Sequence, residues 1–146
     1  LERLYQTKPE EIRPLALRER LEKFAEKVSL SIDQLEDVFE FNEQDLKFIY
    51  RPLTGSVADR QVSFTQCILI GLEEIYQKKS LATSELMKKL DDYGLDSNNL
   101  SRNLQRRPNI FRMTGRGKAT KYKLTDIGKT SAIQLVQTLA TPSTQS

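Results

Sequence analysis

Residues 83–125 read TSELMKKLDDYGLDSNNLSRNLQRRPNIFRMTGRGKATKYKLT, and this stretch decides the fold. Apolar residues at helical spacing predict a helix over 84–93, and Gly94 is suited to end it in the left-handed conformation. A second helix is expected over about 97–107, where Pro108 stops it. Two helices joined by a short turn that contains glycine are typical of a helix-turn-helix motif.

A β-hairpin is predicted directly after these helices. Two short strands are expected over 109–113 and 121–125, with a glycine-bearing loop over 114–120 between them. The second strand alternates basic and apolar side chains, in the order Lys121, Tyr122, Lys123 and Leu124. A basic loop of this kind suits a minor groove or backbone phosphates, and a plain solvated turn is the alternative interpretation.

Charge is segregated along the chain. Between Ser97 and Thr125 there are eight basic residues and no acidic one. The remaining residues carry 15 basic and 20 acidic side chains, so the net charge of +3 hides an acidic remainder. The eight basic residues are Arg102, Arg106, Arg107, Arg112, Arg116, Lys118, Lys121 and Lys123. Segregated positive charge is the electrostatic footprint of a surface that meets phosphates.

The second predicted helix has a polar face that contains no acid. Leu100 and Leu104 point toward the core on a helical wheel. The opposite face and its flanks collect side chains that can hydrogen-bond: Asn98, Asn99, Ser101, Arg102, Asn103, Gln105 and Arg106. Asn and Gln match adenine, Arg matches guanine or phosphate, and the N-terminal part of such a helix faces the bases. Arg106 and Arg107 lie further along and are expected at phosphates, and an ordinary solvated helix face is the alternative.

Three strings in this region resemble parts of winged helix-turn-helix domains. They are SELMKKL at 84–90, LSRNL at 100–104 and YKLTDIG at 122–128, and the resemblance covers residues 56–139. The third string is similar to the strand-to-helix junction after the wing in many bacterial and archaeal regulators. The resemblance implies binding of double-stranded DNA, often as a dimer, with the recognition helix in the major groove and the wing beside it.

The expected function is that of a DNA-binding protein or module that regulates transcription. Its recognition helix lies at about 97–107, and its basic wing lies at 114–120 on the DNA backbone or minor groove. By position in the resemblance, Arg116 and Lys118 are wing contacts. The full set of expected DNA-binding residues is Asn98, Asn99, Arg102, Asn103, Arg106, Arg107, Arg116, Lys118 and Lys121.

The expected fold class is mainly α with a small β-hairpin. A winged helix-turn-helix domain over 56–140 is preceded by a small helical N-terminal lobe over 1–55, which has an acidic surface. A disordered tail is expected over 141–146, because these residues are polar and turn-forming.

Within the N-terminal lobe, an amphipathic helix is expected from about residue 13 to residue 28. The capping-box pattern that begins at Ser31 predicts a further short helix. Residues 31–45 hold six acidic side chains and no basic one. Residues 46–50 fit a strand or another helical turn, and turn-forming residues 51–56 mark the boundary between the lobes.

Two longer helices complete the second lobe. The first is expected over 57–78 and contains Gly71, which indicates close packing because glycine weakens a helix. The last is expected from Thr125 or Asp126 to about residue 139. It carries more apolar residues than a narrow stripe along one side of a helix needs. Either all of them pack on the long helix, or some of them stay exposed and bind a partner.

Composition excludes several kinds of chemistry. The chain has no His, which removes histidine bases, Ser-His-Asp schemes and most zinc sites, and its single cysteine, Cys67, is expected to be a small core residue. No apolar run approaches the roughly 20 residues that span a bilayer, so no membrane association is expected. We therefore expect a non-enzymatic cytoplasmic protein without metal or cofactor, which is nucleoid-associated if it binds DNA.

Two other function classes were weighed against DNA binding. A winged helix can instead assemble proteins, with the N-terminal helices or the last helix as a surface for a homodimer or a protein partner. The chain, which does not begin with Met, would then be a piece of a larger protein. An enzyme has poor support, because no carboxylate pair lies in a recognisable motif. Steep loss of DNA affinity with salt distinguishes the first class from the second.

Overall fold

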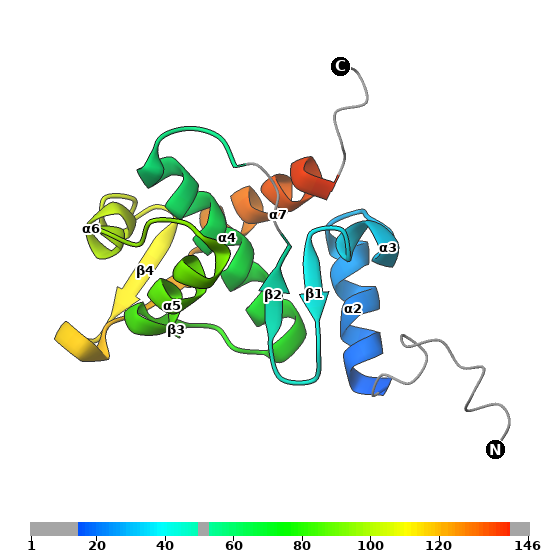
Figure 1. Ribbon diagram of the computed structural model, residues 1–146. Coiled ribbons are helices and arrows are strands. Elements are labelled where there is room, and N and C mark those ends of the chain that lie inside the picture. Colours follow the sequence, from blue (N-terminus) through cyan, green and yellow to red (C-terminus); the bar gives the residue numbers. More distant parts are fainter. Residues whose placement is uncertain (1–14, 50–52, 141–146) are drawn as a thin grey trace, which may run out of the picture.

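The computed structural model describes residues 15–49 and 53–140, and it is mainly helical with two small antiparallel sheets (Figure 1). The coarse expectation of a mainly α fold with a small hairpin is confirmed. Residues 13 and 14 of the first expected helix and the predicted tail at 141–146 lie outside the described residues. The elements are α2 (Leu15–Lys27), α3 (Ile32–Leu35), β1 (Phe39–Phe41), β2 (Leu46–Phe48), α4 (Val57–Tyr76), β3 (Leu81–Ala82), α5 (Thr83–Tyr93), α6 (Leu100–Gln105), β4 (Phe111–Thr114), η2 (Gly117–Ala119), β5 (Lys121–Leu124) and α7 (Asp126–Ala140).

The long helix α4 runs through the middle of the molecule. It begins at a capping box, in which the Ser56 hydroxyl accepts from the Asp59 N–H at 3.1 Å and the Asp59 carboxylate accepts from the Ser56 N–H at 3.2 Å. Buried side chains occur all round the helix between Gln61 and Ile75, as in a helix enclosed by its neighbours. The helix predicted over 57–78 is confirmed and ends two residues earlier.

Helix α2 and the β1–β2 hairpin pack on one side of α4 (Figure 1). The strands pair Phe39 with Phe48 and Phe41 with Leu46, and these four side chains are buried. The expected N-terminal lobe therefore contains a hairpin as well as helices, and residues 46–48 are strand. Strands of three residues are too short to show a period of two in the sequence.

Gly71 marks the place where this hairpin meets α4. A Cβ atom at Gly71 would lie 2.7 Å from the Leu46 Cδ2 and 3.6 Å from the ring of Phe39. The ring of Phe39 lies 5.8 Å from that of Phe48, which in turn lies 5.5 Å from that of Phe64 on α4. The prediction that Gly71 indicates close packing is confirmed, and the buried side chains of both predicted lobes belong to one hydrophobic cluster.

The other side of α4 carries α5, α6 and a three-stranded antiparallel sheet with the strand order β3-β5-β4. Tyr122 pairs with Leu81 on one neighbour and with Met113 on the other. Helix α5 ends at Gly94 with a φ of +89°, as the sequence predicted. No helix in the described part of the chain is long and apolar enough to cross a membrane.

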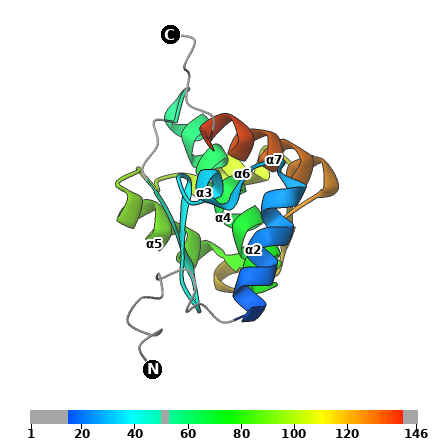
Figure 2. The same ribbon diagram turned by 90° about the vertical axis from the view of Figure 1, so that its right-hand side faces the viewer.

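Helix α7 lies along α4 and reaches the N-terminal elements. Its buried residues are small or β-branched and recur every four positions: Gly128, Ala132, Val136 and Ala140. The Gln66 Nε2 of α4 donates to the Ser131 Oγ at 3.0 Å, and the Gln137 Nε2 donates to the Val28 carbonyl at 2.9 Å. Figure 2 looks onto α2, with the red end of α7 above it. The helix predicted from Thr125 or Asp126 is confirmed, and it begins at Asp126.

The first turn of α7 predicts which glycine tolerates no side chain. A Cβ atom at Gly128 would lie 2.2 Å from the Ile110 carbonyl oxygen, which is backbone and cannot move aside. At Gly71 the nearest atom is the end of the Leu46 side chain, which can move aside. We expect Gly128→Ala to lower the free energy of unfolding by about 1–3 kcal/mol, and Gly71→Ala to cost less. Urea unfolding measures both, and equal effects would contradict this packing.

Candidate nucleic-acid interface

Helix α6 is shorter than the sequence predicted. It covers Leu100–Gln105, whereas a helix over about 97–107 was expected. The Asp96 carboxylate accepts a hydrogen bond from the Asn98 N–H at 2.8 Å, and Asn99 follows with a φ of 63°. A side-chain turn followed by a left-handed residue is not helical, so the prediction of Asn98 and Asn99 as part of the helix was wrong.

A buried glutamine of α4 holds the start of α6. Gln61 has no exposed surface, and its Nε2 donates to the carbonyl oxygens of Asp96 at 2.6 Å and Asn98 at 2.9 Å. Its Oε1 accepts from the Asn103 Nδ2 at 2.7 Å. The amide is thereby bonded at both ends to the turn and to α6. Because a buried polar group without partners is costly, these bonds fix the turn and α6 against α4.

A buried tyrosine of β5 holds the other flank of α6. Tyr122 is 1% exposed, and its hydroxyl lies 3.1 Å from the Ser101 Oγ and accepts from the Gln105 Nε2 at 3.1 Å. Ser101 and Gln105, which were expected on the polar face, are therefore engaged with the sheet. Helix α6 is tied to α4 on one flank and to β5 on the other.

Asn103 is a correction to the expected set of DNA contacts. It is only 8% exposed, and its amide donates to Gln61. On the helical wheel it flanks Leu100 and Leu104, and the partner that draws it inward lies 42 residues earlier in the chain. The structure thus turns the Asn103 amide inward to Gln61 and leaves only a small part of its surface in the hollow beside α6.

Four of the expected contact residues remain exposed around α6: Asn98, Asn99, Arg102 and Arg106. They line a shallow hollow of about 340 Å³, which is closed on its other side by Val57 and Ala58 at the start of α4. None of these four side chains has a hydrogen bond or an ion pair within residues 15–49 and 53–140. Two guanidinium groups and two amides are thus presented on one surface with their donors unused.

Arg107 is partly engaged within the molecule. Its Nη1 donates to the Asn103 carbonyl at 2.9 Å, and its Nη2 lies 3.3 Å from the Asp59 Oδ1. Hydrogen bonds from the backbone and side chain of Ser56, together with Arg107, lower the pKa of Asp59. Arg107 therefore lies at the edge of the exposed surface with its charge already balanced.

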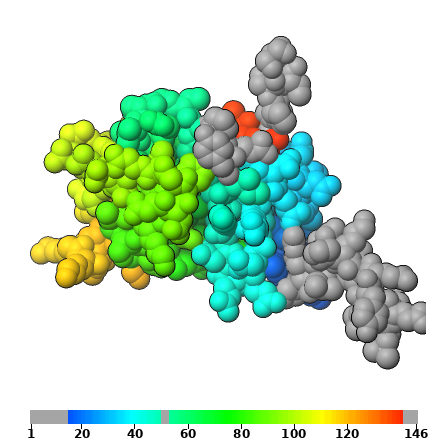
Figure 3. Space-filling model, in the orientation of Figure 1, coloured from blue at the N-terminus to red at the C-terminus, as the bar shows by residue number. Residues whose placement is uncertain are grey.

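The β4–β5 hairpin presents the remaining expected contacts. Gly115 has a φ of +79°, and a Cβ there would lie 2.2 Å from the Ala119 carbonyl oxygen, so the turn requires glycine. Arg116, Lys118 and Lys121 are exposed, and no ion pair involves them in the described part of the chain. The tip of this hairpin projects from the body of the molecule as the orange lobe of Figure 3.

The two signs of charge lie at opposite ends of the structure. Helix α6 and the β4–β5 hairpin form one end, and the acidic stretch from Ser31 to Asp45 lies toward the other (Figure 1). At the basic end, Asp59 is already paired with Arg107, and Asp96 lines the hollow beside α6. An approaching phosphate thus meets the exposed cations of α6 and the hairpin, and the dense acidic stretch lies away from it.

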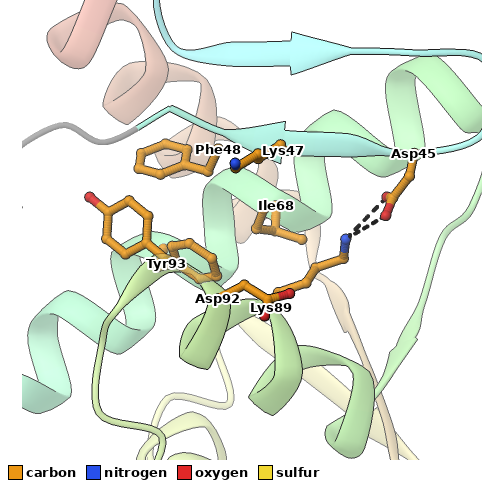
Figure 4. A pocket seen from close by; sticks show the side chains of 8 residues that line it. Asp45, Lys47, Phe48, Ile68, Lys89, Asp92 and Tyr93 are labelled. Carbon is orange, nitrogen blue, oxygen red and sulfur yellow. Dashed lines mark hydrogen bonds and ion pairs between the residues drawn. The ribbon is translucent and has the colours of Figure 1, made fainter.

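Sequence reasoning missed a second hollow, of about 470 Å³, between β2 and α5. Half of its lining residues are apolar or aromatic and half are charged, and the rings of Phe48 and Tyr93 are centred 5.2 Å apart (Figure 4). At its rim the Lys89 ammonium lies 2.9 Å from the Asp45 carboxylate, which ties α5 to the β1–β2 loop. This hollow could not be predicted from the sequence, because β2 has only three residues and its pairing with β1, which places Phe48 here, leaves no recognisable pattern.

Neither hollow has the residues for a recognisable catalytic centre. In the described part of the chain, no group of Cys, Asp and Glu side chains could hold a metal ion. Cys67 is fully buried, as the sequence predicted, and burial raises the pKa of its thiol far above the ordinary range. A thiol that stays protonated is not a nucleophile. What the exposed basic surface can do is bind anions.

The two ties on α6 should differ in strength. Gln61→Met removes a buried amide and leaves the Asn103 amide and two carbonyl groups without their partner, so we expect a loss of about 1–3 kcal/mol in the free energy of unfolding. Tyr122→Phe leaves Ser101 and Gln105 within reach of water, so it should cost about 0.5–1.5 kcal/mol. Chemical denaturation compares them, and a Tyr122→Phe effect larger than that of Gln61→Met would contradict the assignment.

The stabilising contacts of Asp59, first with Ser56 and then with Arg107, should depend on pH. The pKa of Asp59 is lowered in the folded protein, so its stabilising effect is complete above the ordinary aspartate pKa of about 3.9. The effect is lost as the pH falls through the lowered value. Wild type should therefore be more stable than Asp59→Asn at neutral pH, and the difference should shrink below about pH 4. Thermal unfolding across this range measures the difference, and a gap that widens toward low pH would be inconsistent with these contacts.

Neither the models of protein families, nor the curated proteins, nor the solved structures contain a match to this chain.

Proposed function

We propose that this chain is a DNA-binding module of the winged helix-turn-helix type, in which α6 is the recognition helix and the β4–β5 loop is the wing. The succession α4, β3, α5, α6, β4, β5 and α7 supports this proposal, together with the strand order β3-β5-β4. In this arrangement α5 and α6 are the two helices of the motif. The turn between them begins at Gly94, and α6 presents its outer side to the major groove.

The observation that carries the proposal is the unpaired donor set around α6. Arg102 and Arg106 are exposed side by side on the helix, one turn apart, and Asn98 and Asn99 flank its start. A guanidinium can bind guanine or a phosphate in two hydrogen bonds, and an asparagine amide can do so with adenine. Because Gln61 and Tyr122 fix α6 and the turn before it, the backbone that carries these side chains is positioned before DNA arrives, which lowers the entropy cost of binding.

The wing supplies contacts to the backbone in this proposal. Arg116 and Lys118 lie on a loop that projects beyond α6, and Lys121 follows at the start of β5. Phosphate contacts of this kind give affinity without sequence preference and set the orientation of the protein on the duplex. In this proposal the module regulates transcription by occupying DNA and not by catalysis. Asn103 makes no DNA contact in the proposal, because its amide donates to Gln61.

A protein-assembly module is the second candidate, and one observation favours it. Ile127, at the start of α7, is a large apolar side chain that is 62% exposed. It lies beside a shallow hollow of about 370 Å³ whose lining is mostly apolar. A docking partner at this face is compatible with DNA binding at α6, because the two surfaces do not share residues.

Single substitutions test the proposed roles. Arg102→Ala should weaken binding to a preferred duplex by about 1–3 kcal/mol and relax preference at one base pair. Lys118→Ala should weaken all sequences alike, because it removes a phosphate contact. Selection from a random duplex library followed by anisotropy titrations measures both effects.

Lys23→Ala is the matched control, since Lys23 is an exposed cation on α2, distant from α6 (Figure 1). It removes the same charge and should leave affinity within about twofold, since only groups near the phosphates release counterions. If Arg102→Ala behaves like this control, α6 is not the recognition helix. If Lys118→Ala changes sequence preference, the loop reads bases.

A further inference from the structure

The β4–β5 hairpin has a second basic face, of which the contacts proposed above use only Lys121, at the end nearest the loop. In the ladder Arg112 pairs with Lys123, and Thr114 pairs with Lys121. Side chains alternate across a strand, so these four share the face opposite to that of Tyr122 and Leu124. We call this surface the outer face, because Tyr122 on the inner face contacts α6.

The pairing of Arg112 with Lys123 is unfavourable for the hairpin itself. Directly opposed residues have Cβ atoms about 4.5–5.5 Å apart, and like charges at that separation destabilise an antiparallel pair. Arg112 and Lys121 are exposed and Lys123 is half-buried, and none of the three has an ion pair within residues 15–49 and 53–140. The fold thus gathers three cations on one small surface without balancing them.

The charged groups around this face do not neutralise it. Below Arg112 and Lys123 the surface continues into a polar hollow of about 290 Å³, which Thr125, Asp126 and Lys129 also line. Lys129 is held by Glu73 at 2.7 Å. This ion pair raises the pKa of Lys129, to which the nearby Asp126 also contributes, so the ammonium stays charged. Asp126 is the remaining acid in the lining of the hollow, against the charges of Arg112 and Lys123.

The outer face and the exposed side of α6 cannot meet the same straight duplex. Helix α6 packs on the inner face of the sheet, so the two sets of cations project on opposite sides of the hairpin. A duplex lying on α6 reaches the loop at Arg116 and Lys118, but it lies on the far side of the strands from Arg112 and Lys123. Phosphates at the outer face must then belong to another segment of DNA.

We propose that the outer face of the β4–β5 hairpin is a second phosphate-binding surface, which holds a second DNA duplex while α6 holds the first. The proposal rests on the DNA-binding function proposed above and extends it from occupying one duplex to bridging two. The binding at this face has no sequence preference, because guanidinium and ammonium groups on a flat strand surface reach phosphates and not base edges.

One substitution separates this role from a structural one. Lys123→Glu turns the like-charged pair with Arg112 into an oppositely charged pair, which stabilises an antiparallel ladder. The variant should therefore unfold at a temperature equal to or above that of wild type, while its outer face repels phosphate. Arg112→Glu makes the mirror-image change, and Lys23→Glu on α2 is the control with the same change in net charge.

The measurement uses the full chain and two duplexes of unrelated sequence, one immobilised on beads and one labelled with a fluorophore. Wild type should retain the labelled duplex on the beads at low salt. Lys123→Glu and Arg112→Glu should lower that retention by roughly tenfold, as expected for loss of a charge-assisted hydrogen bond, and should still bind the immobilised duplex. Lys23→Glu should behave as wild type.

Every other outcome overturns the inference. If wild type binds the beads but retains no labelled duplex, the second surface does not exist, and DNA binding through α6 stands. If Lys123→Glu retains the labelled duplex, bridging occurs by another route, such as two α6 surfaces of a dimer. If Lys123→Glu loses both duplexes while remaining folded, the outer face belongs to the first site. If wild type binds neither duplex, the proposed function itself fails.

Discussion

The buried amide of Gln61 is the constraint on which the candidate interface depends. One side chain of α4 accepts from Asn103 and donates to the carbonyl groups of Asp96 and Asn98, so it determines where α6 begins and which of its sides is turned inward. Tyr122 completes the arrangement from the sheet. With both flanks of α6 tied, Arg102, Arg106 and the two asparagines before the helix face outward without a side-chain partner in the part of the chain that the structure describes. The buried amide of Gln61 needs hydrogen-bond partners, and the polar groups nearest to it supply them. The polar groups that it does not reach form the exposed surface.

Much of this fold could be predicted from periodicity and turn chemistry. The long helix α4, the glycine that ends α5, the alternation in β5 and the close packing at Gly71 are all local signals, and each is confirmed. The start of α6 was placed too early, because Ser97, Asn98 and Asn99 suit either a helix cap or a turn. The side-chain turn at Asp96 and the contact with Gln61, more than 30 residues away, together select the turn. Asn103 was misplaced for the same reason. The β1–β2 hairpin was missed because each strand has three residues, fewer than a period needs to be recognised.

The distribution of charge fits this division between interior and surface. Several cations form ion pairs that join different elements of the fold. These pairs are Lys27 with Glu74, Lys89 with Asp45, Lys129 with Glu73 and Arg107 with Asp59. Exposed pairs of this kind contribute little to stability, but they show that acids are available in the chain. Between residues 97 and 125 the sequence offers none, and apart from Arg107 the cations of this segment have no ion pair within residues 15–49 and 53–140. A polyanion that presents a regular row of phosphates balances such a group of cations better than single ions do, because contacts to it release many counterions together.

The central claim is that this basic end of the molecule binds duplex DNA through its phosphates. It is tested most directly by fluorescence anisotropy of this chain with a random-sequence duplex, at salt concentrations between about 50 and 200 mM. With Arg106, Arg116, Lys118 and Lys121 at phosphates, we expect micromolar or tighter binding at the lowest salt. The logarithm of the binding constant should fall against the logarithm of salt with a slope of about −4. Absence of binding at the lowest salt, or an affinity that does not change with salt, would contradict the account and would leave α6 and the hairpin as a surface for a protein partner.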